Sequence, residues 1–426
     1  MIPIPSCMRG LSALVFTLLV TAATLFSNAG ARQQQIVTFV GLPILDHAAF
    51  DAGDVSGDGN PDIFLTGMRP NGEPFTGLFI FQERLVTPLP NSSPKVEAVY
   101  QQQSFISRQL MRGTVNWVDL NGDGLEDVIA TGTSVVEVTT NQTELRPFTD
   151  VYLSRNQGLD IERENGLPGV FDSHVVARDF DGDGRTDILL SGDTGDGNIT
   201  GLFWNTGSGT SFIEAAVDFG SMRVEDMTAA DVTGNGLPDI LMTGVDSDGT
   251  VPVTRFFRNE GNGTFVEQPS PLNALYFPTV AAADLTGNGA AELVSTGGLP
   301  DPLLFSGTFT VLENDGNGSF SDGSGLLRDF GTPRPALFRG GTMFGDVNGD
   351  GNRDLVTYGL TGLLEENQNQ ITVYGGTGGA ALVKLGDLGG ILRGHIRLFD
   401  YDGNGRDDIV LMGERFGGLI AQILEF

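Results

Sequence analysis

The stretch that decides the fold is DFDGDGRTDI, Asp179–Ile188, which places four aspartates within nine positions. Like charges this close repel one another, and the two glycines oppose a stable helix. A run of apolar residues follows immediately. The crowding is understandable if a divalent cation lies among the carboxylates.

This pattern occurs seven times, with 52 to 65 residues between successive copies. The copies begin at Asp54, Asp119, Asp179, Asp231, Asp284, Asp346 and Asp400. Thirteen residues after each first aspartate lies a glycine: Gly67, Gly132, Gly192, Gly244, Gly297, Gly359 and Gly413. Seven copies in register indicate a repeat architecture in which each unit is one small supersecondary structure.

Every copy carries an oxygen-bearing side chain at positions 1, 3, 5 and 9 and glycine at positions 4 and 6. Position 7 varies, as expected if it contributes only its backbone carbonyl. Several oxygens converging on one point are what Ca²⁺ requires, since it takes six to eight ligands. An EF-hand needs a glutamate at position 12 and flanking helices, whereas position 12 of the first copy is Leu65. A solvated acidic turn without a metal remains the alternative.

The predicted calcium ligands are the residues at positions 1, 3, 5, 7 and 9 of each copy. In the first three copies they are Asp54, Ser56, Asp58, Asn60 and Asp62; Asp119, Asn121, Asp123, Leu125 and Asp127; and Asp179, Asp181, Asp183, Arg185 and Asp187. In the fourth and fifth they are Asp231, Thr233, Asn235, Leu237 and Asp239; and Asp284, Thr286, Asn288, Ala290 and Glu292. In the last two they are Asp346, Asn348, Asp350, Asn352 and Asp354; and Asp400, Asp402, Asn404, Arg406 and Asp408. The third copy has the most carboxylates, and the fourth and fifth have the fewest, so these two sites are predicted to be the weakest.

The chain has 426 residues and a formal net charge of −30, from 24 basic and 54 acidic residues. Such an acidic chain lacks the basic surface that nucleic-acid binding requires. Twenty of the 54 acidic residues stand at positions 1, 3, 5 and 9 of the seven motifs, so much of the charge is ligand charge. A hydrophobic content of 40% is incompatible with disorder by composition.

Residues 1–31 have the features of a signal peptide. Arg9 precedes an apolar run from Leu11 to Phe26, and Ala29-Gly30-Ala31 fits a signal-peptidase site. Cleavage after Ala31 predicts a secreted or extracytoplasmic protein without a transmembrane span in its mature part. An uncleaved membrane anchor is the alternative, because the run is nearly long enough to span a bilayer. Cys7 is the only cysteine, so the mature chain has no disulfide.

Each repeat is interpreted as four short antiparallel strands, because glycine-rich turns interrupt short apolar runs. One such sheet cannot bury its faces alone, so seven sheets must stack, either as a β-propeller or as an open solenoid. After the seventh motif the chain supplies only two more strands, whereas Gln35–Val40 is an extra strand at the start. If that strand completes the last blade, the ring closes. The sequence therefore predicts an all-β fold, a closed seven-bladed propeller over residues 32–426.

The architecture and the motif D-x-[DNST]-G-[DN]-G-x-x-[DE] resemble the FG-GAP repeat family, the propeller type of the integrin α head and of many secreted microbial proteins. The resemblance covers all seven repeats and implies calcium, at up to seven sites, in the loops that begin at the seven first aspartates. Glu292 at position 9 and the Ser, Thr or Asn at position 3 of several copies depart from the family pattern. The chain has no integrin-like stalk, so integrin-type adhesion does not carry over.

The scarce cationic residues fall at two offsets before the motifs. Seven positions before the first aspartate lie His47, Arg112, Arg339 and Arg393, and five positions before it lie His174 and His395. In a propeller these positions open the innermost strands, so these six residues are predicted to ring the mouth of the central channel and bind an anionic ligand. Pairing with aspartates such as Asp172 and Asp226 is the alternative.

Two functions remain open at this point. The first is a non-catalytic module that recognises an extracellular glycan or protein, as an adhesion protein would. The second is an enzyme of the polysaccharide-lyase or sugar-dehydratase type, in which His174 or His395 would serve as a base near Arg393. The sequence has no G-x-S-x-G or H-E-x-x-H motif and no cysteine nucleophile, which favours the binding module.

Overall fold

The structure is a computed structural model. It describes residues 35–89, 94–105, 107–139, 142–155, 158–162, 165–299, 307–328, 337–360, 369–378, 381–389, 393–415 and 418–425. The predicted signal segment, residues 1–31, lies outside the described residues. One compact unit runs from Gln34 to Phe426, and the following description is of that unit.

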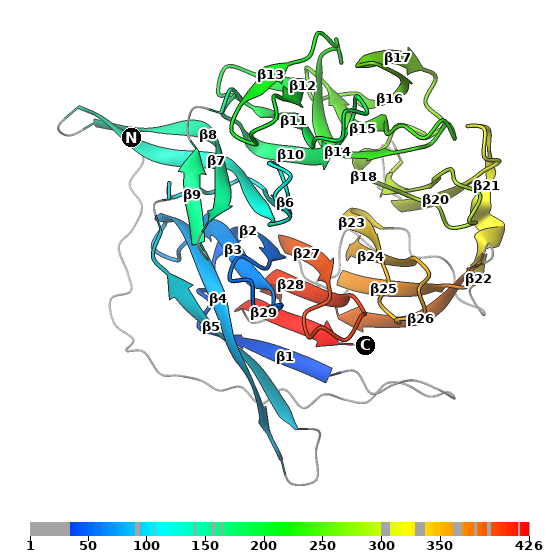
Figure 1. Cartoon of the computed structure of the whole chain (residues 1–426). Coiled ribbons are helices and arrows are strands. Elements are labelled where there is room, and N and C mark those ends of the chain that lie inside the picture. Colours follow the sequence, from blue (N-terminus) through cyan, green and yellow to red (C-terminus); the bar gives the residue numbers. More distant parts are fainter. Residues whose placement is uncertain are drawn as a thin grey trace, which may run out of the picture. The chain divides into compact units, whose positions relative to one another are not determined.

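The unit consists of small, mainly antiparallel sheets whose strands are the expected repeats (Figure 1). The first three sheets contain β2 (Asp46–Gly53), β3 (Asp62–Met68), β4 (Pro74–Thr87) and β5 (Lys95–Gln103); β6 (Val115–Val118), β7 (Asp127–Thr139), β8 (Gln142–Arg155) and β9 (Gly158–Glu162); and β10 (Phe171–Arg178), β11 (Asp187–Asp193), β12 (Asn198–Asn205) and β13 (Phe212–Glu214). The next two contain β14 (Met222–Ala230), β15 (Asp239–Asp246), β16 (Pro252–Gly261) and β17 (Thr264–Gln268); and β18 (Tyr276–Ala283), β19 (Glu292–Gly298), β20 (Gly307–Asn314) and β21 (Phe320–Asp322).

The last two repeats depart slightly from four consecutive strands. The sixth contains β23 (Phe338–Gly345), β24 (Asp354–Leu360), β25 (Asn369–Gly376) and β26 (Leu382–Gly389), and the seventh contains β27 (Arg393–Phe399), β28 (Asp408–Arg415) and β29 (Gly418–Glu425). A short 3₁₀ turn, η1 (Gly323–Leu326), leads into β22 (Leu327–Arg328), which pairs in parallel with β26. The outer edge of the sixth sheet is therefore covered in this region, which protects it from pairing with other chains.

The strand β1 (Gln35–Val40) occupies the place predicted for it. It pairs antiparallel with β29, with Ile36 opposite Leu424, and so adds a fourth strand to the seventh sheet. It also pairs in parallel with β5, with Val37 opposite Val96, which the sequence did not predict. The first and seventh repeats are thus joined through β1 into one eight-stranded sheet.

Apolar side chains fill the spaces between successive sheets. One buried cluster lies between each consecutive pair; the cluster between the third and fourth, for example, includes Phe180, Met227 and Phe257. A further cluster, containing Phe50, Tyr401 and Val410, joins the first sheet to the seventh. The first strand of each repeat also lies against its neighbours, because β2 contacts both β6 and β27. The described part of the chain is therefore a propeller-like stack of sheets.

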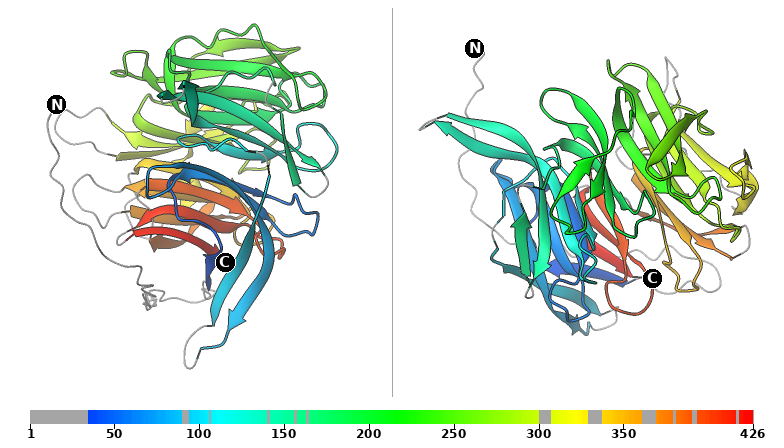
Figure 2. Two further views of the ribbon diagram at one scale, coloured as in Figure 1. Left: turned by 90° about the vertical axis from the view of Figure 1, so that its left-hand side faces the viewer. Right: turned by 45° about the horizontal axis from the view of Figure 1, so that its top comes forward.

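Two long hairpins extend from this stack. Figure 2 shows the β4–β5 and β7–β8 hairpins projecting beyond the other sheets. The outer part of the β7–β8 hairpin is a two-stranded ribbon, whereas β5 pairs with β1 as well as with β4. Both hairpins expose apolar side chains such as Val86 and Leu145. The β4–β5 hairpin reaches the seventh predicted calcium loop, because Arg84 pairs with Asp402 at 3.0 Å.

Candidate functional site

The seven predicted calcium loops share one hydrogen-bonded frame. The carboxylate of position 1 accepts backbone N–H groups of the loop, as in the third copy, where Gly182 and Gly184 each donate to Asp179 at 2.8 Å. The glycines adopt positive φ, at +82° and +86°, which lets both amides face the same carboxylate. The first and last loops make equivalent bonds to Asp54 and Asp400. The loops connect strands and not helices, as predicted.

The acidic residue at position 9 is buried beneath each loop. In the third copy, one Asp187 oxygen accepts the Phe180 N–H at 3.0 Å and the other accepts the Asn205 N–H at 2.9 Å. Its carboxylate therefore ties the loop to the third strand of the same sheet. Each of these oxygens has further lone pairs that can coordinate a cation.

Burial raises the pKa of the position-9 acids Asp62, Asp127, Asp187, Asp239, Glu292 and Asp354, and in four of them nearby loop carboxylates raise it further. The pKa reaches about 6 for Asp62, Asp127, Asp187 and Asp354. For Asp62, the additional repulsion comes from Asp58 and Asp54. A cation among these oxygens would remove that repulsion, so the donor set fits a hard divalent ion such as Ca²⁺.

Within the described residues, two loops bring three carboxylates together. The carboxylate oxygens of Asp179, Asp181 and Asp187 lie within 4.8 Å of one another, as do those of Asp400, Asp402 and Asp408. These are positions 1, 3 and 9 of the two copies that have aspartate at position 3. Two acidic clusters suited to a metal ion are therefore present.

The predicted ligands at position 5 have a different role in this structure. Asp183 accepts the Arg185 N–H at 2.9 Å, and its carboxylate also pairs with the Arg185 guanidinium. Asp123 accepts the position-7 amide in the same way, at 2.8 Å. Asp183 is thus outside the three-carboxylate cluster, although the sequence indicated four converging carboxylates in this loop.

Consecutive loops are linked by contacts that the sequence analysis missed. The side-chain amide of Asn205 donates to the carbonyl of Leu120, in the loop of the preceding repeat, at 2.7 Å. Asn259 and Asn314 do the same toward Phe180 and Val232. The signal was available, because an asparagine ends the third strand in each of these repeats.

Several of the residues seven positions before a motif share an unusual backbone conformation at the start of the inner strand. His47, Arg112, Asp172 and Phe277 all have positive φ, between 44° and 57°. The register shifts at the same point, as between Asp46 and Ala49. This offset is therefore a repeated β-bulge. The glycine at offset +13 lies opposite the bulge, since a Cβ on Gly132 would lie 2.7 Å from the Met111 carbonyl oxygen.

The predicted mouth residues do not all behave alike. Arg112 pairs with Asp172 of the next repeat, its Nε lying 3.2 Å from Oδ1, and exposed His47 lies 3.0 Å from Asp46. The Arg339 and Arg393 side chains lie outside the described residues. His174 and His395 are close enough for the charge of one to affect the pKa of the other, although they belong to the third and seventh repeats.

Arg397, three positions before Asp400, lies beside these histidines and was not predicted. Its Nε is 3.7 Å from the Asp51 carboxylate. Burial raises the pKa of Asp226 to about 7 and that of Tyr358 to about 12, and the Arg397 charge opposes both increases. Burial lowers the pKa of His395, and the Arg397 charge lowers it further. The available signal was one arginine at an offset that other repeats fill with residues such as Val176 and Thr228. The inner strands thus carry a second group of titratable side chains, apart from the loops.

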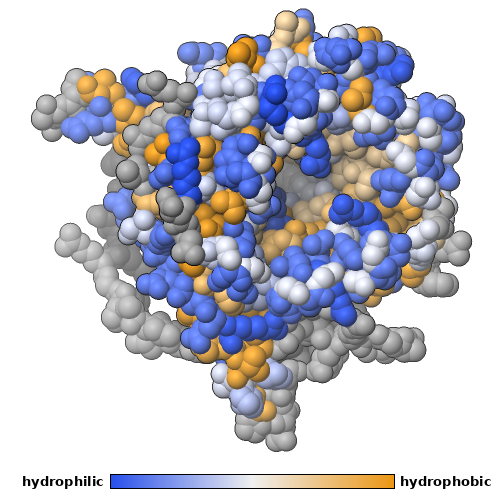
Figure 3. All heavy atoms as spheres, viewed as in Figure 1, coloured by the Kyte–Doolittle hydropathy of each residue, from blue (hydrophilic) through white to orange (hydrophobic). Residues whose placement is uncertain are grey.

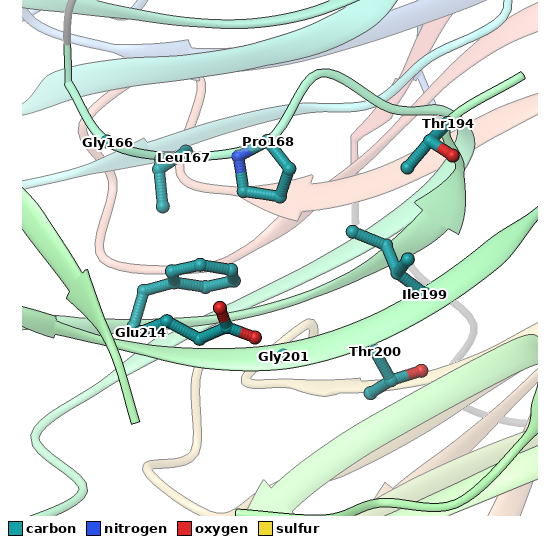
Figure 4. A pocket seen from close by; sticks show the side chains of 9 residues that line it. Gly166, Leu167, Pro168, Thr194, Ile199, Thr200, Gly201 and Glu214 are labelled. Atoms are coloured by element: carbon teal, nitrogen blue, oxygen red, sulfur yellow. The ribbon is translucent and has the colours of Figure 1, made fainter. Parts of the chain in front are cut away.

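A cleft lies elsewhere, between the second and third repeats (Figure 4). It has a volume of about 500 Å³, with Leu167 and Pro168 on one side and Ile199, Phe203 and Glu214 on the other. Glu214 is its one charged lining residue. None of the residues that line it belongs to the predicted sites.

Comparison with known proteins identifies the repeats. The FG-GAP-like repeat matches residues 119–190, 179–242 and 231–295, which confirms the resemblance. A search of curated proteins returned no match. Among the described residues, no helix is both long and apolar enough to cross a membrane.

Three solved structures are similar over most of the chain, at low identity. A Photorhabdus luminescens Tc holotoxin pore is 15% identical with a TM-score of 0.38, over 91% of this chain and 19% of that one. The Leishmania mexicana mannose phosphorylase MPT-4 is 11% identical with a TM-score of 0.34, over 93% and 88%. The V. cholerae biofilm matrix protein Bap1 is 14% identical with a TM-score of 0.32, over 92% and 70%. This chain thus spans about a fifth of the first of these proteins.

Proposed function

Because the chain contains FG-GAP-like repeats, we propose that it is an exported calcium-binding module, a closed seven-bladed propeller that recognises an extracellular glycan or protein without catalysing a reaction. The observation that carries the calcium part is the convergence of Asp179, Asp181 and Asp187 in a loop whose frame recurs in all seven copies. Ca²⁺ would be held at positions 1, 3 and 9 of these loops and would neutralise carboxylates that otherwise repel.

Closure of the ring is part of the proposal. It is supported by the pairing of β1 with β29 and by the apolar cluster that joins the first and seventh sheets. A closed ring leaves each sheet buried on both faces and removes the two ends at which a stack would expose apolar surface. It also explains how a mature chain without disulfides is braced.

Ligand recognition is placed at the mouth of the ring. His47, Arg112, Arg339 and Arg393 share one position at the start of the inner strands while differing in side chain, which is how a repeat protein presents a specific surface. The acidic loops are at the opposite ends of these strands, so calcium braces the ring without occupying the proposed ligand face.

A direct experiment tests the calcium part. The protein purified from its natural export compartment, or refolded without metal, is titrated with Ca²⁺ by isothermal calorimetry, with Mg²⁺ as the control. Saturable binding of several Ca²⁺ per chain supports the proposal. Binding of no Ca²⁺ at millimolar concentration contradicts it, because even weak extracellular sites bind in that range.

A second candidate, an enzyme, is favoured by one observation: Arg397 lies close enough to His395 and Tyr358 for its charge to affect their pKa values. A β-elimination on a uronate needs a base beside a group that neutralises the carboxylate. Incubation with uronate polysaccharides, followed by ultraviolet absorbance of the unsaturated product, distinguishes the two. Product formation that is lost in Arg397→Ala would identify the enzyme.

A further inference from the structure

The second group of titratable side chains is organised around one position of the inner strands. The residue five positions before each motif is Ala49, Thr114, His174, Asp226, Thr279, Gly341 or His395. We call these seven positions the channel ring. Five of them carry polar side chains that can donate or accept hydrogen bonds, and Figure 3 shows that the molecule is hollowed where the inner strands meet.

The space beside Gly341, the glycine of the channel ring, is occupied by a side chain from another strand. A Cβ on Gly341 would lie 2.5 Å from the Tyr358 hydroxyl oxygen and 2.3 Å from its ring. Tyr358, on β24, therefore crosses β23 at Gly341 and places its hydroxyl where the missing side chain would be. The sixth repeat thus contributes a phenol to the channel ring, and only glycine at position 341 leaves room for it.

The charged members of the channel offset one another. Arg397 lies 3.7 Å from Asp51, and their side chains are 28% and 21% exposed, so water reaches both. Asp51 and Asp226 each accept a backbone N–H of the next inner strand, from Trp117 at 3.0 Å and Val280 at 2.8 Å. Both side chains are therefore fixed in place. Burial raises the pKa of both, that of Asp226 to about 7, so the carboxylate that offsets Arg397 is Asp51, its ion-pair partner.

The histidines are neutral under ordinary conditions. Burial lowers the pKa of His174 to about 4 and that of His395 to about 3, and Arg397 lowers the latter further. A neutral imidazole offers one donor and one acceptor. The channel thus contains donors and acceptors from several repeats and little net charge.

We propose that the channel ring, with Arg397 and Tyr358, binds the end of an uncharged glycan. The inference deepens the proposed recognition function and rests on it. Sugar hydroxyls both donate and accept hydrogen bonds, and they match a narrow site lined by carboxylates, imidazoles, a guanidinium and a phenol. An anionic sugar would face Asp51 and would gain little from an arginine that this carboxylate already offsets.

The test uses the full mature protein in saturating Ca²⁺. Neutral disaccharides of glucose, galactose and mannose are added in one arm, and glucuronate and galacturonate in another. Because the chain has three histidines, imidazole ¹⁵N signals report each site separately, with His47 reporting the mouth of the ring. We expect a neutral sugar to shift His174 and His395 more than His47.

Substitutions then identify which side chains contact the sugar. Arg397→Ala should weaken sugar binding at least tenfold, and Tyr358→Phe about threefold to tenfold, as expected for lost hydrogen bonds in a ligand site. Arg223→Ala is the matched control, since Arg223 is exposed and pairs with Glu225. If Arg397→Ala does not fold, Arg397→Gln and Gly341→Ala test the same site, the latter by displacing Tyr358.

The outcomes separate the inference from the proposed function. Sugar binding that shifts only His47 overturns the channel site and leaves a recognition module whose ligand binds at the mouth. Binding of uronates alone overturns the assignment of an uncharged ligand. If no sugar in the panel shifts His174 or His395, the channel inference is wrong, while calcium titration still decides the calcium module independently.

Discussion

The third and seventh repeats carry the same loop chemistry on sheets that are assembled differently. Both have three converging carboxylates, and both contribute a histidine to the channel ring. The third sheet is formed by four consecutive strands, β10 to β13, whereas the seventh needs β1 from the other end of the chain. The comparison shows that the local motif determines the conformation of the loop. The strands that make up its sheet depend on pairing between distant parts of the chain.

Removing β1, the strand that the seventh sheet takes from the other end of the chain, should have the largest effect. Deleting residues 35–40 should unfold or aggregate the protein, because it uncovers β29 and β5 and removes Val37 and Phe39 from the buried cluster. Size-exclusion chromatography and thermal melts measure the effect. The control is Thr38→Ala, which keeps the strand. A monomeric deletion variant with an unchanged melting temperature would contradict closure through β1.

Removing calcium should have the next largest effect. An occupied site adds about 2.7 kcal/mol when free Ca²⁺ is 100 times its dissociation constant, and several sites add together. Excess chelator should therefore lower the melting temperature substantially, and Ca²⁺, but not Mg²⁺, should restore it. An equal melting temperature with and without chelator would show that the loops are acidic turns without a structural metal.

The two channel histidines should each make the protein less stable in acid, while Asp226, whose folded pKa is raised to about 7, acts in the opposite direction. The folded pKa values of the histidines, about 4 and about 3, lie below the ordinary value of 6.5, so the unfolded state takes up protons first. The stability present above pH 6.5 is lost as the pH falls. Each histidine should lower the free energy of unfolding by about 2 kcal/mol between pH 6.5 and pH 5.

The measurement is the difference in denaturant unfolding free energy between these pH values, in saturating Ca²⁺. His174→Gln and His395→Gln should each reduce this difference, and His47→Gln should not. The two channel variants should diverge only below pH 4, where His174 begins to take up its proton in the folded state. Equal pH dependence in all three variants would show that the channel histidines are not buried in solution.

The smallest effect distinguishes the two clustered loops. Asp402 already pairs with Arg84 at 3.0 Å, a contact that competes with a metal, whereas no ion pair of Asp181 is seen among the described residues. The third site should therefore bind Ca²⁺ more tightly. Asp181→Asn should weaken that site about tenfold, or about 1.4 kcal/mol, and Thr286→Ala in the fifth loop should have a smaller effect.

Arg84→Ala tests the same difference in calcium affinity at the seventh loop. Removing the competing guanidinium should tighten the seventh site by a few-fold, as expected for a partly exposed ion pair. Calcium titration of the variant, compared with Arg146→Ala on an exposed hairpin, measures it. A weaker seventh site in Arg84→Ala would mean that Arg84 orients Asp402 for the metal.

The loops and their strands were predictable because their chemistry is local. Ten residues with glycine at fixed positions determine the turn, and Gln35–Val40 was recognised as the partner of the last strands by counting strands. The position-5 aspartates stay predicted ligands; Asp183 lies outside the cluster of Asp179, Asp181 and Asp187 and pairs with an arginine two residues away. The sequence lists possible ligands without showing which side chain turns outward.

The channel was only partly predictable because its contacts join distant repeats. Offsets indicated His174 and His395, and the bulge geometry now explains why polar residues gather seven positions before the motifs. Arg397 stood at an offset that had no pattern. Tyr358 was undetectable, since its place depends on the absence of a side chain at Gly341, in another strand.

The two-sided pairing of β1 has a consequence for the time course of folding. Its partner β29 ends at Glu425, so that pairing must wait until almost the whole chain has been made, and contacts so distant in sequence form slowly. Meanwhile an apolar strand would be open to other chains. Its parallel pairing with β5 needs only the chain as far as Val99, so β1 can pair with the first sheet before β29 has been synthesised.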